Sequence, residues 1–118
     1  MFEINPILFR LSNGIQVVYL KRDAFVAHMG VMIHAGSRFE TPEEEGIAHF
    51  IEHCIFKGTK KRKAFDIFSD LDSVGGELNA YTNKEEICVH ASFRKTHFTI
   101  ASELLGDIVQ NASFPEDE

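Results

Sequence analysis

The stretch Ala48-His49-Phe50-Ile51-Glu52-His53-Cys54 decides how the fold of this chain is interpreted. With about 100° between successive residues of an α-helix, His49, Glu52 and His53 fall on one narrow face of the expected helix. The apolar residues around them gather on the opposite face, which should contact the core: Ile47, Phe50, Ile51, Cys54 and Ile55. We therefore expect the polar face to point away from the core.

The spacing of the three polar residues suits a metal site. Two histidines four residues apart on a helix can reach one divalent ion, and neutral imidazole is a preferred ligand of zinc. Glu52 lies between them and can take a proton from a water molecule beside the ion. The order His-x-x-Glu-His reverses that of the His-Glu-x-x-His zincin motif. On the pattern alone, the alternative of an ordinary solvated helix face stays open.

Length, composition and charge limit the class of protein. The 118 residues suffice for one domain, 1–118, with a single hydrophobic core. No apolar run approaches membrane-spanning length, so we expect no membrane partner. The formal net charge of -6 argues against a nucleic-acid partner, because such binding needs a cationic surface. Residues 57–63 form a local basic run, which we interpret as a solvated loop after the motif helix.

The two cysteines and the first residues bear on the compartment. Two cysteines do not form the disulfide framework of a small secreted protein. The opening residues, Met1-Phe2-Glu3-Ile4-Asn5-Pro6, show neither the basic nor the apolar region of a signal peptide. These features predict a cytoplasmic location.

Apolar periodicity predicts a mixture of strands and helices along the chain. Asn13-Gly14 between two aliphatic runs predicts a hairpin. The run 25–35 is apolar on both faces, so we expect a central strand covered on both sides. Either Thr41-Pro42-Glu43-Glu44 or Gly46 starts the motif helix. The other expected elements are strands at 7–11, 15–20, 77–82 and 87–93, helices at 64–74 and 97–111, and a helix opening at 113–118.

Six stretches spread over nearly the whole chain carry a specific combination of residues. They are Leu11-Ser12-Asn13-Gly14-Ile15, Gly36-Ser37-Arg38, Gly46-Ile47-Ala48-His49-Phe50-Ile51-Glu52-His53, Phe56-Lys57-Gly58-Thr59, Gly75-Gly76-Glu77-Leu78-Asn79-Ala80-Tyr81-Thr82 and the region of Phe114. In this order they resemble the pitrilysin family of zinc peptidases, the inverzincins, whose members include insulin-degrading enzyme and the mitochondrial processing peptidase. The resemblance, with the apolar pattern, implies an α+β fold in which an antiparallel or mixed sheet packs with helices, as part of a LuxS/metalloprotease-like domain of the processing-peptidase type.

Carried over residue by residue, the resemblance implies specific roles. His49 and His53 would ligate zinc, and Glu52 would be the general base of peptide hydrolysis. The segment 77–81 would be a sheet edge against which an extended substrate lies, since an added strand gains backbone hydrogen bonds with little sequence preference. The implied substrate-binding residues are Glu77, Asn79, Ala80 and Tyr81. Without the resemblance, a plain hairpin strand is the preferred interpretation of this segment.

The third zinc ligand is not accounted for. The resemblance places it, a glutamate, beyond Glu118, so we expect this chain to be an amino-terminal segment. Glu103, Glu116 and Glu118 are available, but Glu103 would depart from the family's geometry and the terminal acids should fray. Because a catalytic zinc needs three protein ligands, hydrolysis is expected of the complete protein and not of the isolated chain.

The sequence therefore predicts a zinc-dependent metalloendopeptidase that acts on peptides or unfolded proteins. Its site would be completed by the remainder of the chain or a homologous second half, with a homodimer as a further arrangement. The alternative is a non-catalytic peptide-binding or structural subunit of a processing-peptidase-like complex. The intact His-x-x-Glu-His favours the enzyme, because the family's non-catalytic members usually lose part of this motif.

Overall fold

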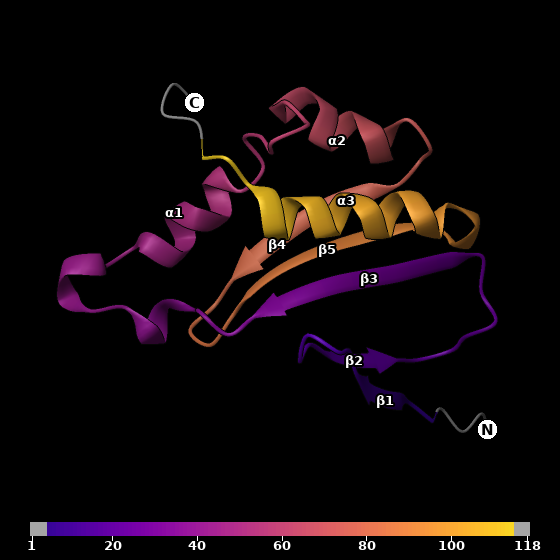
Figure 1. Ribbon diagram of the computed structural model, residues 1–118, viewed down its shortest axis with the longest axis horizontal. Coiled ribbons are helices and arrows are strands. Elements are labelled where there is room, and N and C mark those ends of the chain that lie inside the picture. The colour runs from indigo at the N-terminus through magenta and orange to yellow at the C-terminus, as the bar shows by residue number, and fades with distance from the viewer. Residues whose placement is uncertain (1–4, 115–118) are drawn as a thin grey trace.

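Strands and helices are interspersed along residues 5–114, the part of the chain described by the computed structural model (Figure 1). The strands are β1 (Ile7–Arg10), β2 (Gln16–Tyr19), β3 (Val26–Ile33), β4 (Glu77–Thr82) and β5 (Ile87–Arg94). The α-helices are α1 (Ile47–Cys54), α2 (Ala64–Asp72) and α3 (Phe98–Asn111), and three 3-10 turns are η1 (Ser37–Phe39), η2 (Pro42–Glu44) and η3 (Lys95–His97). The predicted α+β class is confirmed.

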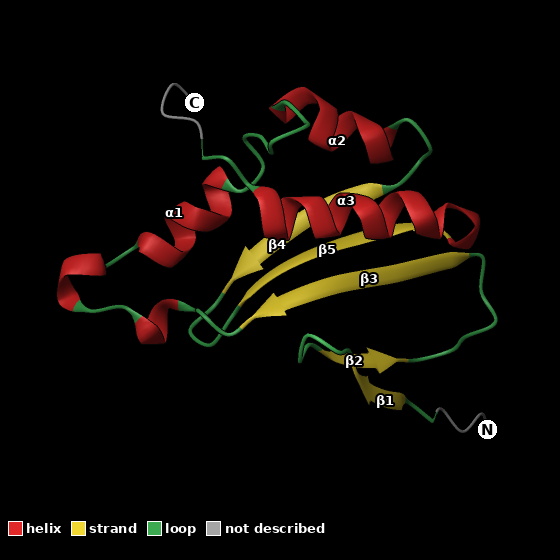
Figure 2. Cartoon of the chain, viewed as in Figure 1, coloured by secondary structure: helices red, strands yellow, loops and turns green. Residues whose placement is uncertain are grey.

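The core lies between a three-stranded antiparallel sheet and the helix α3. The strand order is β3-β5-β4, so β5 is central. Because side chains alternate along a strand, Val89, Ala91 and Phe93 of β5 share one face, and all three are buried in the core. Leu104 and Ile108 of α3 are buried in the same core. Figure 2 shows α3 running along the sheet.

The position of β3 contradicts the sequence-based prediction of a central strand covered on both sides. In the described residues β3 is an outer strand, and its burial alternates strictly along its length. Ala27 and Met29 face the core, whereas Val26 and Met32 on the other face are exposed. A strand with apolar residues on both faces can therefore leave one of them exposed within residues 5–114.

Both predicted hairpins are confirmed. β1 pairs with β2 as a separate two-stranded sheet, and Gly14 in their turn has a φ of 94°, which favours glycine. β4 pairs with β5 from Glu77↔Ser92 to Thr82↔Ile87. In the turn between them, the Asn83 side-chain oxygen accepts the N–H groups of Glu85 (2.9 Å) and Glu86 (2.8 Å).

The segment before the motif helix is attached to this second turn. The N–H of Gly36 donates to the carbonyl oxygen of Glu85 (3.2 Å), and that of Ser37 donates to the carbonyl oxygen of Asn83 (3.0 Å). A Cβ added at Gly36 would lie 2.4 Å from the same Asn83 oxygen. Only glycine allows this close approach of two backbones.

The start of the motif helix combines the two alternatives left open by the sequence. Thr41 and Glu44 form a capping box around η2, but α1 itself begins after Gly46, whose φ is 89°. The carboxylate of Glu40 accepts the N–H groups of Gly46 (3.2 Å) and Ala48 (2.7 Å). Glu40 thus satisfies amide groups that have no partner within the helix.

The other helices follow the predictions closely. α2 ends at Asp72, shortly before Gly75, whose φ is 79°, as the predicted glycine stop requires. α3 covers nearly all of the predicted segment 97–111. The helix expected to open at 113–118 falls mostly on residues 115–118, which lie outside the described residues. Within residues 5–114, no helix has the length and apolar character needed to cross a membrane.

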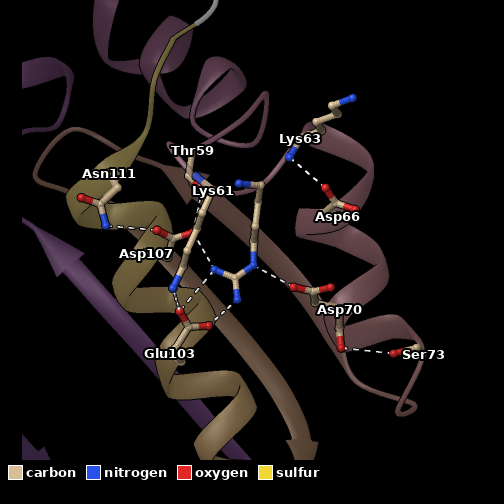
Figure 3. A network of polar contacts seen from close by, with 10 residues as sticks. Thr59, Lys61, Lys63, Asp66, Asp70, Ser73, Glu103, Asp107 and Asn111 are labelled. Carbon is tan, nitrogen blue, oxygen red and sulfur yellow. Dashed lines mark hydrogen bonds and ion pairs between the residues drawn. The ribbon is translucent and has the colours of Figure 1, made fainter.

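The basic run after α1 is not simply a solvated loop, because Arg62 forms ion pairs with three carboxylates. Figure 3 shows the surrounding network of polar contacts, in which Asp70, Glu103 and Asp107 are labelled. The Arg62 side chain is only 13% exposed, and its guanidinium contacts Asp70 of α2 (2.7 Å) and Asp107 of α3 (2.5 Å) and also pairs with Glu103 of α3. We call the following residues the Arg62 cluster: Thr59, Lys61, Arg62, Asp70, Glu103, Asp107 and Asn111.

These contacts change the ionisation of the cluster. Hydrogen bonds from Arg62 and then from Lys61 lower the pKa of Glu103. Burial by itself would raise the pKa of Asp107, but hydrogen bonds from Thr59, Arg62 and Asn111 outweigh burial and lower it. Conversely, the hydrogen bond to Glu103 is the main cause that raises the pKa of the Arg62 guanidinium. Arg62, Glu103 and Asp107 therefore stay charged at neutral pH, and the cluster joins the segment after α1 to α2 and α3.

Candidate functional site

The motif helix α1 packs against the outer strand β4. His49 and His53 are both exposed, in agreement with the prediction that they point away from the core. The predicted apolar face is wrong in part, because Ile47 and Phe50 are exposed while Ala48 is buried. The helix is thus rotated from the orientation that the hydrophobic pattern alone suggested.

This rotation changes the place of Glu52. Its side chain is half-buried, and it accepts a hydrogen bond from the hydroxyl of Thr82 at the end of β4. Thr82 shares one face of β4 with Leu78 and Ala80, which pack against the core. The prediction that Glu52 points away from the core is therefore wrong: its carboxylate faces the sheet while the two imidazoles face outward.

The strand β4, which ends at Thr82, has one free side. In the described residues β4 has β5 as its neighbour on one side only, so the backbone groups on its other side could pair with a further extended chain. The N–H of Ala80 donates to the side-chain oxygen of Asn79 (2.9 Å). A backbone donor of β4 is therefore occupied by a flexible side chain rather than by another strand.

The remaining predicted substrate residues lie along the same strand. Glu77, Asn79 and Tyr81 are exposed on the face opposite the core, and Ala80 is half-buried on the core side. The Tyr81 ring lies 5.9 Å from that of His90. The pKa of Tyr81 is raised mainly by a hydrogen bond with the Cys88 side chain and secondly by desolvation, so its phenol is neutral at physiological pH. The structure thus brings all four residues onto one strand beside α1.

The donors present fit part of a zinc site. Among residues 5–114, no group of three or more His, Cys, Asp or Glu side chains is placed to hold a metal ion. His49 and His53 offer two exposed imidazoles one helical turn apart, which is the donor type that zinc prefers. Glu103 is engaged by Arg62 and Lys61, and Glu116 and Glu118 lie outside the described residues.

Two residues near the site were missed by the sequence analysis. The sequence around Thr82 indicates no role for its hydroxyl, because Glu52, the residue that it contacts, lies far away along the chain. Glu40 precedes the helix by several residues, so no short capping pattern identifies it. The acidic side chain before Gly46 was the available signal, since carboxylates favour helix amino termini.

Comparison with known proteins gives a consistent result. Residues 16–118 match the family described as Insulinase (Peptidase family M16). The chain is 42% identical over 107 residues to the "Probable mitochondrial-processing peptidase subunit beta, mitochondrial" of Arabidopsis thaliana, covering 90% of this chain and 20% of that protein. It is 39% identical over 112 residues to the "Uncharacterized zinc protease YmxG" of Bacillus subtilis, covering 93% of this chain and 27% of that protein.

A solved structure agrees with these sequence matches. The crystal structure of a protease from Helicobacter pylori superposes with a TM-score of 0.92 at 28% identity, covering 98% of this chain and 28% of that one. The chain therefore spans between about a fifth and just over a quarter of the length of these relatives.

Proposed function

This chain belongs to the insulinase family of peptidases, family M16, and on that basis we propose that it supplies part of the catalytic site of a zinc-dependent metalloendopeptidase. The activity is that of the complete protein, since the chain spans only part of its relatives. One observation carries the proposal: α1 holds Glu52 against Thr82 at the end of an outer strand, with His49 and His53 exposed beside it.

The residues named here would have separate roles in hydrolysis. His49 and His53 would hold zinc, with the remaining protein ligand supplied from outside the described residues. Zinc, when bound, polarises a peptide carbonyl and makes a water molecule easier to deprotonate. Glu52 accepts the proton of the attacking water and returns it to the leaving amine. Thr82 donates to one carboxylate oxygen of Glu52 and so limits its rotation.

The substrate would be an extended peptide or an unfolded protein that pairs with the free side of β4. Such pairing uses backbone groups and tolerates many sequences. For a peptide to use the N–H of Ala80, the Asn79 side chain must release it. Glu77 and Tyr81 would contact substrate side chains from the exposed face of the strand. The rest of the enclosing wall would come from the remainder of the chain, from a homologous second half or from a second copy.

The proposal is tested by substitutions in the complete protein. Glu52→Gln should leave the zinc content unchanged but lower kcat for an unstructured peptide by about a hundredfold or more, because it removes the base. His49→Ala should lose zinc, measured by metal analysis after gel filtration. His28→Ala is the matched control, because His28 is also an exposed histidine but lies on β3. It should keep both zinc and activity.

Two results would contradict the proposal. Undiminished hydrolysis by Glu52→Gln would exclude Glu52 as the base. A complete protein that binds the unstructured peptide but neither contains zinc nor hydrolyses it would favour the non-catalytic peptide-binding subunit instead.

A further inference from the structure

A groove of about 650 Å³ lies between α2 and the first half of β4. Its apolar lining includes Phe65, Phe68 and Leu78, and its polar lining includes Asp72, Glu77 and Asn79. The groove is separate from the motif helix, and neither its aromatic residues nor Asp72 has a part in the chemistry described above. It nevertheless begins on the strand proposed to hold the substrate.

The aromatic side of the groove is open to solvent. Phe65 is 79% exposed and Phe68 is 47% exposed, although both lie on a helix of nine residues. Ile67 and Leu71 of the same helix are fully buried, so α2 already has a complete apolar face toward the core. The two phenylalanines form a second apolar face, and such exposed apolar surface commonly marks an interaction site.

Residues of the groove connect it with the motif helix and with Glu52. The ring of Phe68 lies 5.4 Å from that of Phe56, which follows shortly after α1. Leu78 lines the groove, and farther along the same strand Thr82 contacts Glu52. With a rise of about 3.3 Å per residue, four residues of strand span roughly 13 Å. An extended peptide alongside β4 would therefore place a side chain about four residues from its scissile bond in the groove.

The charge of the groove restricts its occupant further. Asp72 and Glu77 are exposed, and neither forms an ion pair with any cation among residues 5–114. The whole chain has a formal net charge of -6. Two carboxylates beside exposed aromatic rings favour a ligand that is both apolar and cationic.

We propose that the groove between α2 and β4 is a substrate subsite that binds a large apolar side chain with a basic residue beside it. The inference rests on the proposed function, because the proposed peptide alignment on β4 brings this part of the substrate to the groove. Phe65 and Phe68 cover the apolar side chain, and Asp72 and Glu77 attract its basic neighbour. The subsite selects substrates at a distance from the scissile bond.

The test uses binding as well as cleavage in the complete protein. The probes are 15-residue unstructured peptides that differ only in one dipeptide, Phe-Arg or Ser-Gln, moved stepwise along the sequence. Their binding to the Glu52→Gln variant is measured by fluorescence anisotropy, so that hydrolysis does not interfere. We expect the best-placed Phe-Arg peptide to bind about tenfold more tightly than its Ser-Gln counterpart.

Two variants assign this preference to the groove. Phe65→Ser in the Glu52→Gln background should remove the tenfold preference and leave the Ser-Gln peptide unaffected, since this side chain is mostly exposed and its loss should not impair folding. Phe25→Ser is the matched control, because Phe25 is 83% exposed but lies before β3. A further peptide that carries Phe-Gln tests the charge. Asp72→Asn should weaken binding of the Phe-Arg peptide more than binding of the Phe-Gln peptide, and this difference should shrink at high salt.

The outcomes separate the subsite from the proposed function. A Phe-Arg preference abolished by Phe65→Ser supports the subsite, even if wild-type protein hydrolyses no peptide and the proposed function fails. A preference that is absent, or equally reduced by Phe25→Ser, overturns the subsite even if hydrolysis is efficient. If Phe65→Ser instead changes oligomeric state or stability without affecting peptide binding, another part of the protein covers the groove and the subsite is also overturned.

Discussion

Replacing Arg62 by methionine should loosen the segment between α1 and α2 without disturbing the sheet. Methionine keeps an unbranched apolar side chain of comparable reach but removes the cation. Asp107 then stays in place with a side chain only 3% exposed and without its charged partner. Thr59 and Asn111 still donate hydrogen bonds to it, so the carboxylate is only partly compensated.

The magnitude follows from the exposure of each partner. Removing one member of a buried ion pair costs about 3–5 kcal/mol. The contacts of Arg62 to Asp70 and Glu103, whose side chains are 40% and 44% exposed, add at most about 1 kcal/mol each. Because Asp107 keeps two hydrogen bonds, we take the lower end and expect a loss of about 3 kcal/mol.

Hydrogen exchange of the complete protein measures this loss locally. A decrease of about 3 kcal/mol in the free energy of opening corresponds to roughly hundredfold faster amide exchange in residues 57–63 and the facing part of α3. Lys61→Met is the matched control: Lys61 pairs with Glu103 at the surface, so exchange should rise less than about fivefold. Equal effects of the two substitutions would refute the assignment of Arg62 as the stabilising partner of the buried Asp107.

Three further predictions concern pH, packing and catalysis. Folding lowers the carboxyl pKa values of Glu103 and Asp107, so their stabilisation is complete above about pH 4.5 and is lost as pH falls through the folded values. Urea midpoints between pH 6 and 3 should therefore fall less steeply in Arg62→Met than in the unchanged protein. Gly36→Ala should lower the free energy of unfolding by about 2 kcal/mol or more, because the added Cβ would clash with the backbone of the β4–β5 turn. Gly106→Ala, whose added Cβ would meet no atom within 4 Å, should be neutral or stabilising by up to about 1 kcal/mol. Thermal melts that rank the two variants in the opposite order would contradict these contacts. Thr82→Val should reduce kcat of the complete enzyme about tenfold with little change in KM, and Thr82→Ser should restore it; a valine variant of normal kcat would exclude a positioning role.

Local sequence patterns were enough to predict most of the secondary structure. Asn13-Gly14 and Gly75-Gly76 terminate elements through backbone conformations that depend on glycine itself, so their effect is visible without tertiary information. The helical spacing of apolar residues likewise identified α3 almost to its ends. The α+β class followed from these elements together, and the spacing of His49 and His53 on one helix face needed no other part of the chain.

The tertiary structure alone decided how these elements are used. β3 has apolar residues on both faces, but only strand pairing makes it an outer strand and β5 the central one. The sequence pattern groups Arg62 with the solvated cations of residues 57–63, but its side chain is largely covered because α2 and α3 bring carboxylates to it from 8 and 45 residues away. Glu52 faces Thr82, 30 residues farther along the chain, because α1 packs against β4 in an orientation that buries Ala48 and leaves Phe50 exposed. Hydrophobic periodicity reports which side chains are apolar, whereas the packing of whole elements selects which of them are covered, and that selection placed Glu52 beside β4.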